Sequence, residues 1–223
     1  MLEGISWLEE DSIDFQRKWI DRDPSGYRLH WTTVATRAKE IGIRVSGHFD
    51  NNAALPDARA ARRAIQYVLR VFENVDAILL VRDLDDQPER QQGLEQARRA
   101  DHSGTSIILA VANTERECWV LCGFVPKDEF EERLLQRERQ ELGANPCLRS
   151  EELTACKDDS ALRSPKRVLK VLTGDDWERQ RECWKDTSLD LLKERGIGNG
   201  LTSYLEEIKV NLAPLISGLK TRG

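Results

Sequence analysis

Carboxylate residues follow three apolar segments of this 223-residue chain, at the point where each segment ends. The chain places Glu9, Glu10 and Asp11 after the first segment, Asp83, Asp85 and Asp86 after the second, and Glu115 and Glu117 after the third. Carboxylates gathered without a cation repel one another, whereas a divalent ion neutralises them and also contacts phosphate oxygens of a substrate. The pattern therefore predicts a Mg²⁺ site, with Mn²⁺ as a substitute, that works on phosphodiesters.

Asp83 and Asp85 form the expected centre of this site. Residues two apart in an extended chain point the same way, so the two carboxylates are expected to face one cation. A structural alternative stays open, because acidic residues at strand ends also serve as helix caps and solvated loops. For Glu10, a favourable interaction with the dipole of a following helix is an adequate structural explanation.

The elements that must position these acids alternate between strand and helix. Short apolar runs predict strands over residues 4–8, 77–81 and 105–112, and the run at 77–81 is expected to be buried on both faces. A polar helix from Pro88 to about Arg99 joins the last two strands, which favours a parallel sheet. Ligands collect at the carboxyl ends of such strands. The expected fold class is α/β, a mainly parallel sheet flanked by helices.

Helical periodicity accounts for most of the remaining chain. Residues 56–72 carry an apolar stripe on one side and four arginines largely away from it (Arg59, Arg62, Arg63 and Arg70). Residues 28–45 are ambiguous between strand and helix. Further helices are expected over residues 13–20, 114–123, 128–142, 165–172, 175–195 and 201–217. We therefore expect an α/β core over residues 1–125 and a helical C-terminal extension over residues 126–223, packed on the core.

Composition limits the classes of partner. The formal net charge of −5 argues against a protein that coats nucleic acid by bulk electrostatics, so any contact with nucleic acid is expected to be local. The five cysteines form no paired C-x-x-C units, which favours reduced thiols. No apolar run approaches the roughly 20 residues that a membrane span needs, and no secretory signal is read at the N-terminus. We expect a cytoplasmic protein with no membrane contact.

Three motifs carry a resemblance to a known family. They are the segment Leu80–Asp86 (LVRDLDD), the triplet Glu117-Cys118-Trp119 and the pair Pro165-Lys166. In this order, behind an early glutamate, they resemble the TOPRIM fold of topoisomerases, primases and OLD-type nucleases, and more narrowly a set of small bacterial TOPRIM-like families. The resemblance covers residues 1–125 in pattern rather than in close sequence.

The resemblance implies roles for individual residues. It implies a metal-binding set of Glu10, Asp14, Asp83, Asp85 and Glu117, and a catalytic set of Glu10, Asp83, Asp85 and Lys166. Lys166 would be a cation near the scissile phosphate, although a solvated lysine at a helix start is an equal alternative. The first motif of the family usually reads glutamate then glycine, whereas Asp11 follows Glu10 here. The choice between Glu9 and Glu10 therefore stays open.

Three functions are consistent with these residues. The first is a Mg²⁺-dependent nuclease or phosphodiesterase acting on DNA or RNA, which the resemblance places in antiviral defence beside a partner ATPase. The second is a non-catalytic interaction subunit that binds such a partner, and the third is a nucleotide phosphohydrolase. The sequence leaves the oligomeric state open, including a homo-oligomer.

Overall fold

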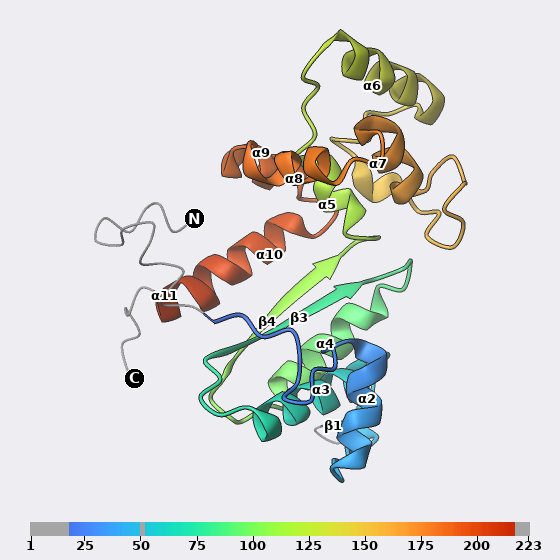
Figure 1. The fold of residues 1–223 in the computed structure, drawn as a ribbon. Coiled ribbons are helices and arrows are strands. Elements are labelled where there is room, and N and C mark those ends of the chain that lie inside the picture. Colours follow the sequence, from blue (N-terminus) through green and yellow to red (C-terminus); the bar gives the residue numbers. More distant parts are fainter. Residues whose placement is uncertain (1–17, 50–51, 217–223) are drawn as a thin grey trace. The chain divides into compact units, whose positions relative to one another are not determined.

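A computed structural model describes residues 18–49 and 52–216 of the chain, and most of its elements are helices (Figure 1). The first half contains the helices α2 (Trp31–Glu40), α3 (Ala58–Val71) and α4 (Glu89–Arg99), and the strands β1 (His48–Phe49), β2 (Asn52–Ala53), β3 (Ala77–Asp83) and β4 (Ser106–Ala112). The second half contains α5 (Glu117–Cys122), α6 (Glu129–Leu142), the 3₁₀-helix η1 (Ser150–Glu152), α7 (Pro165–Thr173), α8 (Trp177–Lys185), α9 (Leu189–Arg195), α10 (Leu201–Glu207), the π-helix η2 (Ile208–Leu212) and α11 (Ala213–Ile216). Among these described helices, none is long and apolar enough to cross a membrane.

The chain divides into two compact units that are not continuous in sequence. Of the described residues, unit 1 contains those up to Leu80, Glu89–Leu109 and those from Glu207 onward. Unit 2 contains Val81–Pro88 and Ala110–Glu206. The strands β3 and β4 each begin in unit 1 and end in unit 2, so the carboxyl ends of both strands belong to unit 2.

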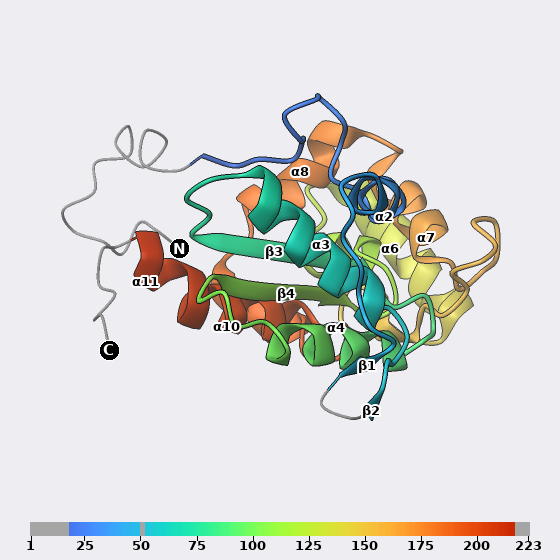
Figure 2. The ribbon, with the colours of Figure 1, turned by 90° about the horizontal axis from the view of Figure 1, so that it is seen from below.

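Unit 1 is built on the predicted strand–helix–strand sequence. β3 and β4 are hydrogen-bonded neighbours that run parallel, and the helices α3 and α4 pack together beside them (Figures 1 and 2). The approach of the two helices depends on Gly93 of α4, because a Cβ atom there would lie 1.7 Å from the carbonyl oxygen of Pro56. Only a residue without a side chain fits at this position.

The two strands differ in burial. Every residue from Ile107 to Ala112 of β4 is buried, as expected for a strand covered on both faces. In β3 only Ile78 and Leu80 are buried and their neighbours are partly exposed, so the prediction that residues 77–81 are buried on both faces is wrong. The predicted first strand, residues 4–8, lies outside the described residues. Among those described, the parallel sheet has two strands.

Unit 2 has its own hydrophobic core, formed where α5, α6, α7 and α8 meet. Its buried members include Leu121 and Phe124 near α5, Leu135 of α6 and Leu172 of α7. Trp119 of α5 stacks on Tyr204 of α10, with ring centroids 5.1 Å apart. This core holds α5 and α7 together, and these two helices carry candidate site residues described below.

Most of the predicted helices are confirmed, including those over residues 56–72, 128–142 and 165–172. The ambiguous segment 28–45 contains the helix α2. The single helix predicted over 175–195 is wrong, because Ser188 caps a new helix by accepting a hydrogen bond from the backbone N–H of Leu191. Residues 18–20 are not helical, and the rest of the predicted helix 13–20 lies outside the described residues.

Candidate functional site at the ends of β3 and β4

A tight turn follows β3 and fixes the positions of the acidic residues there. The backbone N–H of Gln87 donates to the carbonyl of Leu84 at 2.9 Å, and the two central residues, Asp85 and Asp86, have φ values of 48° and 60°. Two successive positive φ angles define a type I′ turn, which favours aspartate, asparagine and glycine. Because β3 ends at Asp83, the strand alternation that was expected to align Asp83 with Asp85 does not reach Asp85.

Backbone hydrogen bonds fasten this turn to the end of β4. The N–H of Leu84 donates to the carbonyl of Ala112 at 2.9 Å, and the N–H of Asp85 donates to that of Thr114 at 3.1 Å. The Thr114 hydroxyl in turn donates to the carbonyl of Leu153 at 2.7 Å. The acidic turn after β3 and the segment after β4 are therefore held beside each other within unit 2.

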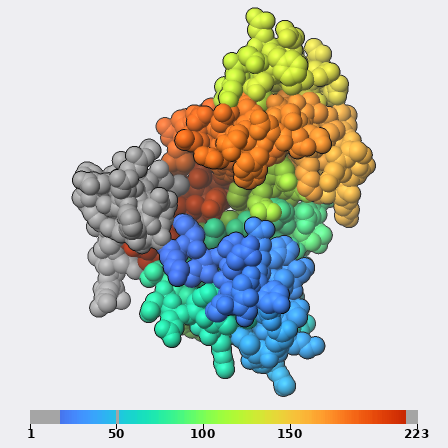
Figure 3. All heavy atoms as spheres, viewed as in Figure 1, coloured from blue at the N-terminus to red at the C-terminus, as the bar shows by residue number. Residues whose placement is uncertain are grey.

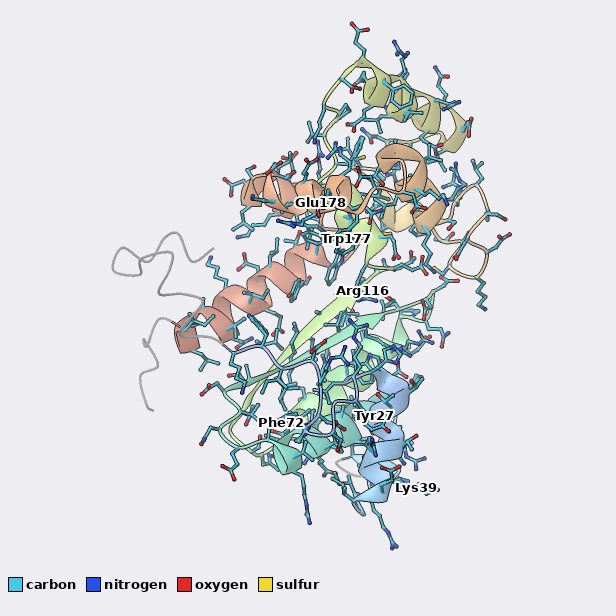
Figure 4. All side chains as sticks on the ribbon, in the orientation of Figure 1. Tyr27, Lys39, Phe72, Arg116, Trp177 and Glu178 are labelled. Carbon is cyan, nitrogen blue, oxygen red and sulfur yellow. The ribbon has the colours of Figure 1, made fainter. Side chains whose placement is uncertain are left out.

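Arg116 binds the carboxylate of Asp83. Its backbone N–H and its Nε both lie 3.1 Å from Asp83 Oδ1, and its Nη2 lies 3.3 Å from Oδ2. Arg116, labelled in Figure 4, lies between the end of β4 and the start of α5. The Asp83 side chain is 24% exposed and that of Arg116 59% exposed, so the ion pair is open to solvent and exchangeable.

Glu115 is the most buried carboxylate at this place, with 4% of its surface exposed. Its Oε1 lies 3.0 Å from the Nζ of Lys166, whereas its buried Oε2 has no hydrogen-bond partner among the described residues. Burial raises the pKa of Glu115, and the charges of Glu117 and Asp83 act in the same direction; the hydrogen bond from Lys166 does not fully offset them. The carboxylate is therefore held in a place that disfavours its charge.

Lys166 belongs to the first turn of α7 and bridges two carboxylates. Its Nζ lies 3.0 Å from Glu115 and 3.1 Å from Asp159. The hydrogen bond to Glu115 raises the pKa of Lys166, so the ammonium stays protonated. Ser164 caps α7 and Pro165 occupies its first turn, which is why the helix begins where Lys166 can reach Glu115.

The thiol of Cys156 is affected by charges at the ends of the two strands. Burial raises the pKa of Cys156, and the charges of Glu115, Asp85 and Asp86 raise it further. The bond from Asp85 to Thr114 and that from Arg116 to Asp83 thus bring Asp83 and Asp85 beside Glu115, which belongs to the predicted acidic pattern but not to the implied metal-binding set.

The remaining predicted residues have different outcomes. Glu117 is the first residue of α5 and its charge acts on Glu115. Lys166 lies in the cluster, as described above. Glu10 and Asp14 lie outside the described residues, as does Glu9. Sequence reasoning named Glu115 in the acidic pattern but left it out of the metal-binding set, although Glu115 stands closer to the end of β4 than Glu117 does. It did not select Arg116.

The fit of a divalent cation can be tested on the oxygens of this cluster. The unpartnered, buried Oε2 of Glu115 suits a cation ligand, because an unsatisfied buried carboxylate oxygen otherwise costs free energy. Asp83 would become a ligand only when Arg116 releases it. In residues 18–49 and 52–216, no group of three or more His, Cys, Asp or Glu side chains is already arranged around one ion position.

Comparison of the chain with protein-family models, with curated proteins and with solved structures gives no match. The resemblance to TOPRIM-like proteins therefore stays a prediction from the motifs of the sequence.

Proposed function

We propose that this protein is a Mg²⁺-dependent phosphodiesterase that hydrolyses nucleic acid, DNA or RNA. The observation that supports it best is Glu115, a buried carboxylate with one oxygen on Lys166 and the other without a partner among the described residues. The ion pair with Lys166 accounts for one oxygen of this carboxylate but not for the other. A cation-binding role does explain it, because a bound cation would satisfy the free oxygen.

The residues that would hold the cation are Glu115 and Asp83. Glu117, whose charge acts on Glu115, and Asp85, in the turn that is bonded to Thr114, would add negative charge around it. Oxygen ligands of this kind are those that Mg²⁺ and Mn²⁺ prefer. Once bound, such an ion supplies a Lewis acid that polarises the phosphodiester. The protein contributes the fixed strand ends that hold Asp83 and Glu115 at one place.

The two cationic side chains of the cluster have complementary roles in the proposed hydrolysis. The oxygen of a water molecule forms a bond to phosphorus while the bond from phosphorus to the leaving oxygen breaks, and the proton that the water loses is transferred to the leaving alkoxide. Negative charge grows on the phosphoryl oxygens in this step, and Lys166 and Arg116 are placed to offset it. Because Arg116 is exposed, it exchanges its contact with Asp83 for one with the substrate phosphate.

The resemblance to OLD-type proteins adds a partner to this proposal. A nuclease of that kind would work with an ATPase in antiviral defence, and co-purification with the product of a neighbouring ATPase gene would test the association. An assembly that forms equally well with Asp83→Asn protein, together with no cleavage by the wild type, would instead favour the non-catalytic subunit.

The direct test is cleavage of single-stranded DNA, duplex DNA, RNA and free nucleotides with Mg²⁺, Mn²⁺ or EDTA. We expect metal-dependent cleavage of a polynucleotide that falls by about 10²–10³-fold in Asp83→Asn and Glu115→Gln proteins. Glu206→Gln is the matched control, because Glu206 also pairs with a lysine at 3.0 Å, Lys193, in the same unit.

Three results would contradict the proposal. Cleavage that is unchanged in both site variants would place the activity elsewhere. An equal loss in Glu206→Gln protein would show a general effect of removing an ion pair. Hydrolysis confined to free nucleotides would identify a nucleotide phosphohydrolase instead.

A further inference from the structure

The helix α3 presents a row of arginines on one side of unit 1. Arg59, Arg63 and Arg70 are four and seven residues apart, spacings that return to the same side of a helix. Arg59 and Arg70 are exposed and Arg63 is partly exposed. In the space-filling view, atoms of the segment that runs from α3 into β3 (teal) reach the surface of unit 1 (Figure 3).

The described residues leave these three guanidinium groups without an acidic partner. Within the part of the chain that the structure describes, none of them makes an ion pair or a side-chain hydrogen bond. Two acids beside α3 are already engaged, since Asp57 pairs with Arg90 at 3.6 Å and Asp101 pairs with Arg62 at 2.5 Å. The row is therefore a local positive surface on a chain whose net charge is −5.

An open pocket lies at the C-terminal end of this row. Its volume is about 500 Å³, and its polar lining includes the paired Arg62 and Asp101 together with Gln66, Arg70 and His102. Because Asp101 is already paired with Arg62, the groups that can donate hydrogen bonds to a phosphate there are the guanidinium of Arg70, the amide of Gln66 and the imidazole of His102. Arg70 is thus both the last member of the row and a wall of the pocket.

The length of the row indicates what occupies it. Arg59 and Arg70 are separated along the helix axis by about 16 Å, a distance over which one nucleic-acid strand carries several phosphates. A free nucleotide would use the pocket alone and leave Arg59 and Arg63 without a function. We propose that the row Arg59, Arg63 and Arg70, together with its pocket, binds the phosphodiester backbone of a nucleic-acid strand.

This inference rests on the proposed function, because the surface would hold the nucleic acid that the proposed phosphodiesterase cleaves. The two are separable by experiment, because strand binding is measured in EDTA, where the proposed hydrolysis does not occur. The test compares the triple variant R59Q/R63Q/R70Q with the triple variant R133Q/R137Q/R139Q. The control removes three exposed arginines from α6, a helix with the same number of residues as α3, 14, so both variants change the net charge equally.

Binding to the whole 223-residue chain is followed by the anisotropy of fluorescent oligonucleotides of about 20 nucleotides, as single-stranded DNA, duplex DNA and RNA. At about 50 mM salt we expect the α3 triple variant to bind at least about 10-fold more weakly than wild type, and the α6 variant to lose less than about threefold. The slope of log Kd against log salt should fall by about 2 in the α3 variant on single strands. Circular dichroism and thermal melting confirm that both variants fold.

Equal losses in the two triple variants would overturn the inference, because only bulk charge would then matter. Absence of polynucleotide binding by wild-type protein at low salt would overturn it as well. So would displacement of every oligonucleotide by a mononucleotide at a similar phosphate concentration, since the pocket would then hold a small ligand. If the α3 variant loses strand binding while Asp83→Asn protein keeps its cleavage activity, the proposed binding surface is supported and the proposed catalytic site is contradicted. If the α3 variant keeps strand binding while Asp83→Asn protein loses cleavage, the proposed catalytic site is supported and the proposed binding surface is contradicted.

Discussion

Two buried glutamates of unit 2 should respond differently to the same substitution. Glu138 is 2% exposed and both of its oxygens are bonded by Arg167, at 3.0 and 2.6 Å. Glu115 is 4% exposed, but only one of its oxygens has a partner among the described residues. We predict that Glu138→Gln destabilises the protein strongly, whereas Glu115→Gln does not.

The magnitudes follow from the partners that each substitution leaves behind. Glu138→Gln leaves the largely buried guanidinium of Arg167 without its carboxylate, and breaking such a pair costs about 3 kcal/mol. Glu115→Gln removes a charge that burial, Glu117 and Asp83 all disfavour, and Lys166 keeps its contact with Asp159. The loss of one partly exposed ion pair lowers the free energy of unfolding, and removal of the unfavourable buried charge raises it. The two effects should cancel to within about 0.5 kcal/mol.

The assay is equilibrium unfolding in urea, followed by far-UV circular dichroism. With a slope of about 3 kcal/mol/M, Glu138→Gln should lower the transition midpoint by about 1 M, and Glu115→Gln by less than about 0.2 M. The raised pKa of Glu115 also predicts the direction in which the stability of the protein changes with pH. The folded state holds this proton more tightly than the unfolded state, so wild-type protein loses stability as pH rises above 4.5, the ordinary pKa of the side chain. Relative to wild type, Glu115→Gln should therefore gain stability over that range.

A comparable loss in the two variants would refute this reasoning. It would mean that Glu115 is a structural residue whose ion pair with Lys166 stabilises the fold as much as that of Glu138 does. A relative stability of Glu115→Gln that is independent of pH between about 4 and 8 would refute the part that rests on its buried charge.

Three further substitutions test the packing of each unit. Gly93→Ala should lower stability by about 3 kcal/mol in a thermal melt despite the better helix propensity of alanine, because the new Cβ would collide with the backbone of Pro56; an unchanged melting temperature would contradict the close approach. Tyr67→Phe removes the hydroxyl that donates to Asp23 at 2.8 Å. Burial alone would raise the pKa of Asp23, but this hydrogen bond and those from two backbone N–H groups lower it below its ordinary value. Burial and the bond to Asp23 raise the pKa of Tyr67 to about 12. The stability that Tyr67→Phe protein loses relative to wild type should be largest at neutral pH and should shrink as pH falls below 3.8. A loss of stability that grows in acid would contradict this prediction. Asn199→Ala should cost about 3 kcal/mol in urea unfolding, because the two N–H groups of the fully buried amide are shared among three acceptors; a cost below about 1 kcal/mol would contradict that role.

The local pattern of the sequence was sufficient to predict the elements that carry the site. α3 has an apolar stripe at helical spacing, and the apolar runs before Asp83 and Glu115 both form strands. These signals are local, because they depend on neighbours within one or two turns. The break between α8 and α9 was missed, although Ser188 is a typical helix cap and could have indicated it.

The candidate site depends on contacts that local pattern does not contain. Glu115 stands out because Lys166, from the distant helix α7, reaches one of its oxygens and leaves the other buried. Asp83 is bound by Arg116 only because the two strand ends meet. The expected strand alternation fails at Asp85 because a turn with positive φ begins there, and aspartate is one of the residues that tolerate it.

A divalent-cation site at the ends of β3 and β4 is the proposal on which the function depends. A crystal of the full chain grown with Mn²⁺, with data collected at the manganese absorption edge, tests it directly. We predict an anomalous peak within about 2.3 Å of oxygens of Glu115 and Asp83, with Arg116 displaced from Asp83. A well-ordered site with no peak, and with Arg116 still bound to Asp83, would contradict the proposal.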